Sequence, residues 1–241
     1  ALLADATSKM ASVASISLSG NKITGTKRER REWKYDLDLS GIIAFGEAAA
    51  VSKTLASIDL SDCGISSKGI AEVARFMSAG TSIVTINISQ SKIGVEGGQA
   101  IVEALKTTTL ESIVIGNDLT LQLKGELESD SFDASGQSID PGYAMIMAWW
   151  LTTPVTASLT SLCCGSNPIK DEGMAVLLDA VKGIGLIEFD ISKTSIGPPT
   201  AKKLAEVLSD ATPFTTSLTS LRCGSNPGMV GELWPSGDLK R

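Results

Sequence analysis

The sequence predicts an α/β solenoid, in which stacked units place parallel strands on a concave face and helices on a convex face. Two observations lead to this fold class. One apolar pattern recurs every 27 or 28 residues through much of the chain, and a stretch with helical periodicity follows most copies. One strand and one helix cannot bury both of their apolar faces alone, so such units must cover one another by stacking.

The spacing of the two element types predicts curvature. Parallel strands stack about 4.8 Å apart, whereas packed helices need about 8–10 Å. A stack with strands on one side and helices on the other is therefore expected to bend into a horseshoe or arc, with the strands inside.

Strands are expected where the pattern apolar-x-x-apolar-x-apolar-x-x-Asn/Cys-x-apolar occurs. Seven copies are clear, and they begin at Val13, Leu55, Ile83, Leu110, Leu159, Leu186 and Leu218. Two weaker copies, at 37–42 and 132–139, bring the expected number to about nine strands. The Asn or Cys is expected to satisfy backbone groups that turn toward the core. This position holds Asn21, Cys63, Asn167 and Asn226.

Helices are expected after the clear copies. In the stretch 69–77, Ile70, Val73 and Met77 fall on one face at helical spacing. The stretches 100–105 and 175–181 repeat this spacing, and Pro199 suits the first turn of a helix over 200–208.

The whole chain, 1–241, is expected to form a single domain of this kind. Residues 1–12 are interpreted as the end of a preceding repeat's helix, and residues 229–241 as a C-terminal cap or tail. The ranges 24–34 and 120–130 do not follow the pattern and are expected to be irregular polar inserts.

Composition excludes several classes of function. The 241 residues include no histidine, which excludes Ser-His-Asp and Cys-His catalysis and histidine-ligated zinc. The net charge of −6 disfavours nucleic acid and anionic membranes as partners. Four cysteines without a framework spacing favour a reducing, cytoplasmic location. No apolar run is long enough to span a membrane, and we expect no cofactor and no metal site.

Two phrases resemble a known family. The segments SLTSLCCGSNPIKDEGMAVLLDAV and LASIDLSDCGISSKGIAEVARFM are similar to leucine-rich repeats of the ribonuclease-inhibitor type. The resemblance covers about 13–226. It implies a leucine-rich repeat solenoid, and the same subfamily supplies ligand-binding arcs in nucleotide-binding immune receptors and in the Ran GTPase-activating protein. The two inserts depart from the family's regular pattern.

The candidate binding site is the concave face, because strand side chains alternate and the residues between the apolar positions point outward. Several of these positions and their neighbours are acidic, which predicts a face that binds a basic protein or peptide. The predicted site residues are Tyr35, Asp36, Asp38, Asp59, Asp62, Asn87, Glu111, Asp133, Glu188, Asp190 and Arg222. The sequence thus indicates a protein-interaction scaffold and not an enzyme.

Three other functions compete with this interpretation. The chain could be a structural subunit of a larger complex that contacts partners through its ends and convex helices. Asp38 and Asp59, if on adjacent strands, could act as the carboxylate pair of a glycoside hydrolase. The family resemblance also suggests GTPase activation, although no residue of this chain maps to that role. The mixed-charge run 27–32 is either a docking signal or a solvated loop.

Overall fold

The computed structural model describes residues 12–79 and 82–230. The chain forms two compact units, Ala1–Lys124 and Gly125–Arg241, which are described one at a time. Because the two units are described separately, the expectation that 1–241 forms a single domain stays a prediction. The predicted repeat end at 1–12 and most of the predicted cap at 229–241 lie outside the described residues.

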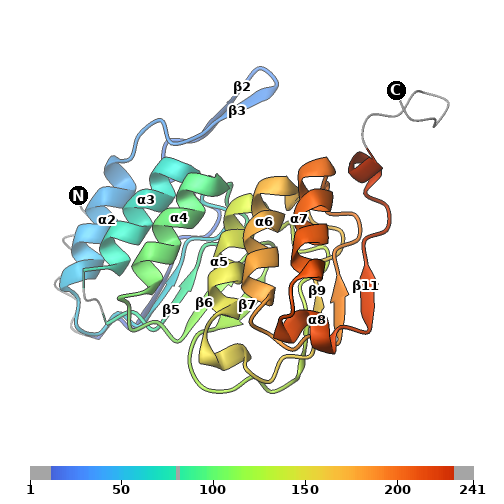
Figure 1. The fold of residues 1–241 in the computed structure, drawn as a ribbon. Helices are drawn as coiled ribbons and strands as arrows, with labels where there is room; N and C mark the ends of the chain where they lie inside the picture. The colour runs from blue at the N-terminus through green and yellow to red at the C-terminus, as the bar shows by residue number, and fades with distance from the viewer. Residues whose placement is uncertain (1–11, 80–81, 231–241) are drawn as a thin grey trace. The chain divides into compact units, whose positions relative to one another are not determined.

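The first unit contains a five-stranded sheet in the order β1-β4-β5-β6-β7. Its first four strands in this order are parallel and comprise β1 (Ser15–Ser17), β4 (Ser57–Asp59), β5 (Thr85–Asn87) and β6 (Ser112–Ile115). Strand β7 (Leu119–Gln122) is antiparallel to β6. Helices α2 (Ser40–Val51), α3 (Ser67–Met77) and α4 (Gly94–Leu105) lie side by side along one side of this sheet, as Figure 1 shows.

The second unit contains a four-stranded parallel sheet in the order β11-β10-β9-β8. Its strands are β8 (Ser131–Asp133), β9 (Ser161–Cys163), β10 (Glu188–Asp190) and β11 (Ser220–Arg222). The helices of this unit are α5 (Pro141–Leu151), α6 (Lys170–Val181), α7 (Pro198–Ser209) and the short α8 (Pro213–Ser217), with 3-10 turns at Pro154–Thr156 and Pro227–Val230.

The strand register explains how each unit buries its core. The middle residues of neighbouring strands are paired, so Ile58 faces Ile86 and Leu162 faces Phe189. These middle side chains are buried under the helices, while the first and third residues of each parallel strand stay at least partly accessible. Alternation along a strand thus gives every repeat one inward residue between two outward residues.

Eight of the nine expected repeat strands are present, and one is wrong. Residues 37–39 form no strand but lead into helix α2, where the Asp38 carboxylate accepts a bond from the Ser40 amide. The expected helices are confirmed as α3, α4, α6 and α7.

The two inserts are more ordered than expected. The range 24–34 contains an antiparallel hairpin of β2 (Lys27–Glu29) and β3 (Glu32–Lys34). The range 120–130 begins within β7, which is the edge strand of the first sheet.

The expected asparagine positions act as backbone partners. The buried Asn167 amide donates to the carbonyls of Ala134 and Cys164, and its oxygen accepts from the Ile139 amide. Asn226 bonds Ile191, Cys223 and Thr194 in the same way. These side chains join successive turns, so the ladder is confirmed at both positions.

Within the described residues, no helix has both the length and the apolar character that crossing a membrane would need.

Candidate functional site

The outward residues at the ends of the strands form the candidate site. Asp59, Asn87, Asp133, Asp190 and Arg222 are the last residues of β4, β5, β8, β10 and β11. Glu188 begins β10, and Glu111 directly precedes β6. These seven predicted residues therefore lie on, or next to, the outward side of the strands in their own units.

Four of these side chains also hold the turn that follows their strand. Each accepts a hydrogen bond from the amide two residues later, at 2.8–3.0 Å. The pairs are Asp59–Ser61, Asn87–Ser89, Asp133–Ser135 and Asp190–Ser192. Such Asx turns need a side-chain oxygen but no charge. The repeat therefore explains an Asx residue at this position, whereas the turn does not by itself explain why three of the four are aspartates.

The turn continues with a residue in the left-handed region of backbone conformation, three positions after the outward residue. Its φ lies between +49° and +76° in all cases. The residues are Gly20, Asp62, Gln90, Gly136, Ser166, Lys193 and Ser225. Asp62 is thus a turn residue and not part of the sheet face, and its carboxylate pairs with Lys22 at 2.8 Å.

Three further predicted residues do not lie on the sheet, which corrects their assignment to the concave face. Asp38 accepts a bond from the Ser40 amide at the start of α2. The Asp36 carboxylate binds the amides of Ser66 and Gly69 at the start of α3. Tyr35 lies under the ammonium group of Lys92, which is 5.3 Å from the ring centre. All three belong to the segment that returns from the hairpin.

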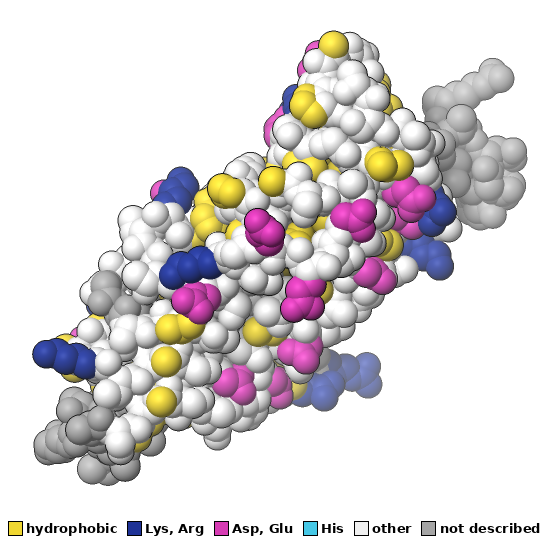
Figure 2. Space-filling view, turned by 90° about the horizontal axis from the view of Figure 1, so that it is seen from below, with side chains coloured by type: hydrophobic (Ala, Val, Ile, Leu, Met, Phe, Trp, Pro, Cys, Tyr) yellow, Lys and Arg dark blue, Asp and Glu magenta, His cyan; other side chains and the backbone are white. Residues whose placement is uncertain are grey.

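Two of the carboxylates on the sheet have a lowered pKa, which favours their ionised form. Hydrogen bonds from Ser135 lower the pKa of Asp133 below its usual value. Partial burial acts to raise the pKa of Asp59, but bonds from Ser61 and Ser17 outweigh it, so this pKa is also lowered. Figure 2 shows Asp and Glu side chains dispersed over one face of the molecule with uncharged surface between them.

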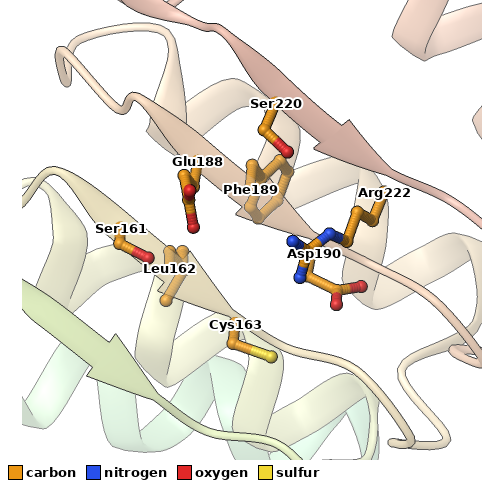
Figure 3. A pocket seen from close by; sticks show the side chains of 8 residues that line it. All are labelled: Ser161, Leu162, Cys163, Glu188, Phe189, Asp190, Ser220 and Arg222. Carbon is orange, nitrogen blue, oxygen red and sulfur yellow. The ribbon is translucent and has the colours of Figure 1, made fainter.

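In the second unit, three outward residues form a row across β9, β10 and β11. Asp190 is in register with Cys163 on one side and with Arg222 on the other. Figure 3 shows their side chains, which line a hollow with a volume of about 50 Å³. Small-molecule sites usually enclose roughly 300–1,000 Å³. The hollow therefore suits contact with a protruding side chain of a macromolecule better than capture of a free metabolite.

The expected carboxylate pair for hydrolysis does not form. Asp38 is off the sheet, and the strand neighbours of Asp59 are Ser17 and Asn87. Burial raises the pKa of the Cys163 thiol, with the nearby carboxylates adding to the effect, so this cysteine is not an activated nucleophile. In the part of the chain that the structure describes, no group of three or more Cys, Asp or Glu residues could hold a metal ion.

A second hollow, which the site prediction did not include, lies beside the hairpin. It has a volume of about 230 Å³. Its lining comprises Lys22, Thr26, Trp33, Tyr35, Asp62, Gly64, Gln90 and Lys92. Two aromatic residues directly after a run of basic residues were the signal in the sequence, but only the fold of the hairpin brings them against the turns of the next two repeats.

Comparisons with known proteins concern the repeat. Residues 51–74 match the family model described as Leucine Rich repeat. This range begins at the last residue of α2 and includes β4 and most of α3. No curated protein matches the chain. Among solved structures, the chain is similar to the tropomodulin C-terminal domain of Caenorhabditis elegans, at 12% sequence identity and a TM-score of 0.33. That match covers 86% of this chain and 91% of the other.

Proposed function

We propose that this chain, which has the leucine-rich repeat fold, binds a basic segment of a partner protein on the outward side of its strands. Leucine-rich repeat domains generally act in protein–protein interaction, and the finer statement about the surface and the charge is the proposal. The ribonuclease-inhibitor type is the subfamily we propose, because repeats of 27 or 28 residues with full helices are typical of it.

The observation that carries the proposal is the charge of the outward strand residues. We define the sheet-face acids as the four carboxylates on the strands, which are Asp59, Asp133, Glu188 and Asp190. Only Arg222 opposes them among the residues of the parallel strands β1, β4–β6 and β8–β11. Carboxylates without a matching set of cations attract a basic partner and raise its association rate.

An internal repeat supports the use of this surface. Residues 158–168 and 217–227 are identical except at one position, where Cys163 in the first copy corresponds to Arg222 in the second. The shared residues supply the inward Leu positions, which are buried in the first copy and half-buried in the second, and the ladder asparagines. The one residue that differs points outward beside Asp190. Because the side chain at this position points outward, folding does not restrict its identity, as expected of a residue in a contact surface.

The experiment must remove charge without losing the Asx turns. Asn87 already makes this turn with an amide oxygen, so Asp→Asn changes keep the geometry. One variant combines Asp59→Asn, Asp133→Asn, Glu188→Gln and Asp190→Asn. A matched control removes four exposed acids on helices through Glu96→Gln, Glu103→Gln, Glu172→Gln and Glu206→Gln.

Wild type and both variants are immobilised, and partners from the native source are quantified by mass spectrometry. We expect basic partners to be lost from the sheet-face variant and retained by the control. Equal retention by both variants contradicts the proposal. Loss only from the control would instead assign binding to the helical side, as for a subunit that uses its convex helices.

The compartment expected from the sequence is also part of the proposal. All four cysteines are free thiols, and two of them are buried. Free thiols support a reducing, cytoplasmic environment.

A further inference from the structure

The hairpin β2–β3 has the opposite charge to the rest of the chain. Its eight residues carry a net charge of +3, whereas the whole chain carries −6. Glu29 is neutralised within the hairpin by Lys27 at 2.8 Å and by Lys34 at 2.9 Å. The remaining cations are three arginines that are exposed and make no ion pair with any residue that the structure describes. They are Arg28, Arg30 and Arg31.

An aromatic anchor lies beside these arginines. Trp33 is directly opposite Arg28 in the hairpin register, and 47% of its surface is exposed. Its ring centre is 6.4 Å from that of Tyr35. Both rings line the 230 Å³ hollow beside the hairpin, together with Lys92 and with Lys22 and Asp62, which pair with each other at 2.8 Å. The hollow thus combines aromatic walls with the positive charge of Lys92 and of the nearby hairpin arginines, which is suited to an apolar side chain flanked by carboxylates.

The hairpin is held to the repeats at its base. On the incoming side, the hydroxyls of Thr24 and Thr26 donate to the carbonyl of Gly64. On the outgoing side, the Asp36 carboxylate binds the amide and hydroxyl of Ser66. An isolated two-stranded hairpin is marginally stable in water. Anchoring of both sides presents the arginines and Trp33 in one arrangement, which lowers the entropic cost of binding.

We propose that this surface binds an acidic peptide segment of another protein, with one apolar side chain inserted beside Trp33. The hairpin surface is defined as Arg28, Arg30, Arg31, Trp33 and Tyr35. Arginine and tryptophan are the residues most enriched in binding hot spots. A nucleic acid or an anionic membrane fits less well, because three arginines are few for either and the net charge of the chain opposes a large polyanion. This binding is separate from that on the sheet face, since the two surfaces attract partners of opposite charge.

The test uses a fluorescent heptapeptide of six glutamates with a central phenylalanine, and a second peptide with alanine at the centre. Binding is measured by anisotropy at low ionic strength. We compare wild type, the variant Arg28→Gln/Arg30→Gln/Arg31→Gln, and Trp33→Ala. A control with the same loss of charge removes three exposed lysines elsewhere in the first unit, through Lys53→Gln, Lys68→Gln and Lys106→Gln.

We expect the phenylalanine peptide to bind wild type and the lysine control equally. The arginine variant and Trp33→Ala should each bind about tenfold more weakly, as for loss of several exposed charges or of one aromatic anchor. Trp33→Phe should restore much of the affinity. Because all these side chains are exposed, the variants should keep the circular dichroism and melting temperature of wild type, which excludes unfolding as the cause of lost binding.

Four results would overturn the proposal. Equal binding by the arginine variant and the lysine control would show that charge on the hairpin is irrelevant. Equal binding of the alanine and phenylalanine peptides would remove the role of the hollow. Tighter binding of a single-stranded oligonucleotide or of phosphatidylserine vesicles, lost on the arginine changes, would assign the hairpin to a polyanion instead. Self-association that is lost in the arginine variant would make a second copy of the chain the occupant.

Discussion

The hydroxyl of Ser66 donates a 2.6 Å hydrogen bond to the carboxylate of Asp36, which lies 30 residues earlier in the chain. The same carboxylate accepts from the amides of Ser66 and Gly69. Ser66 is the N-cap residue of α3, yet its own side chain makes no cap bond to the helix. Asp36, two residues after the end of the hairpin, therefore caps the helix of the following repeat and fixes the base of the hairpin in place.

Loss of this cap should destabilise the first unit. Asp36→Ala is expected to lower the free energy of unfolding by about 1–2 kcal/mol, because it removes a cap and leaves helix-terminal amides without a partner. Asp36→Asn should cost less, since one oxygen remains. Asp62→Asn is the control, because it keeps a residue type that tolerates the left-handed conformation and removes only an exposed ion pair with Lys22 that is worth about 0–1 kcal/mol. Urea unfolding measures all three, and an Asp36→Ala effect no larger than that of Asp62→Asn would contradict the assignment.

The second unit uses the same device, and here it predicts a pH dependence. Partial burial acts to raise the pKa of Asp171, but hydrogen bonds from Thr200 and Gly197 outweigh it, so the pKa is lowered. A lowered pKa in the folded state gives stability that is fully present above the unfolded pKa of about 3.9 and is lost as the pH falls through the folded value.

Asp171→Asn should therefore be less stable than wild type at neutral pH, and the difference should shrink as the pH falls below about 3.9. Thermal unfolding of both proteins across this range measures the difference directly. A gap that stays constant with pH would show that the charge of Asp171 has no part in holding α7.

The buried asparagines should be among the most sensitive polar residues. Asn167→Ala leaves the Ile139 amide and the Ala134 carbonyl without their partner inside the core. We expect a loss of about 2–4 kcal/mol, since each unsatisfied buried group costs about 1–3 kcal/mol. Asn167→Asp should be at least as harmful, because a carboxylate cannot donate to carbonyls. Asn21→Ala, at an exposed copy of the position, provides the comparison in denaturant unfolding, and equal losses would refute the ladder's role.

The left-handed turn residues permit a reciprocal exchange. Gly136 and Lys193 occupy equivalent positions in their repeats, with φ of +64° and +55°. No atom lies within 4 Å of a Cβ added to Gly136, so the left-handed backbone conformation is the only cost of placing a side chain there. Lys193→Gly should stabilise by up to about 1 kcal/mol, and Gly136→Lys should destabilise by a similar amount. Melting temperatures that move in the same direction for both changes would contradict this account.

Two substitutions at one sheet-face acid, Asp190, should distinguish the contribution of its turn hydrogen bond to stability from the contribution of its charge. Asp190→Asn keeps an acceptor for the Ser192 amide and should leave stability unchanged within about 0.5 kcal/mol. Asp190→Ala removes the acceptor and should cost about 0.5–1.5 kcal/mol. Chemical unfolding of the two variants checks this order, and the reverse order would mean that the carboxylate charge itself stabilises the turn.

The repeat pattern predicted the strands and helices well because the same physical need recurs in every unit. Ile58, Ile86 and Ile113 must be buried, and stacking is the way to bury them. The pattern failed at 37–39, because Asp38-Leu39-Ser40 has the same Asx signal as Asp59-Leu60-Ser61, although it precedes a helix. An Asx residue followed two positions later by serine marks a turn and does not specify the element before it.

The site was only partly predictable for a similar reason. Alternation along a strand placed Asp59, Asp133 and Asp190 on the outward side. The role of Asp36 depends on bonds to a helix 30 residues away, and the hollow beside Trp33 depends on how the hairpin folds back over the turns. Neither relation leaves a periodic trace in the sequence.

Carboxylate footprinting tests the central claim most directly. Free and partner-bound protein are labelled with a carbodiimide and an amine, and modification of each Asp and Glu is quantified by mass spectrometry. If the partner binds the outward side of the strands, labelling of Asp133, Glu188 and Asp190 falls on binding, while labelling of the helical residues Glu96, Glu103 and Glu206 stays constant. Protection of the helical residues with unchanged labelling on the strands would contradict the proposed binding face.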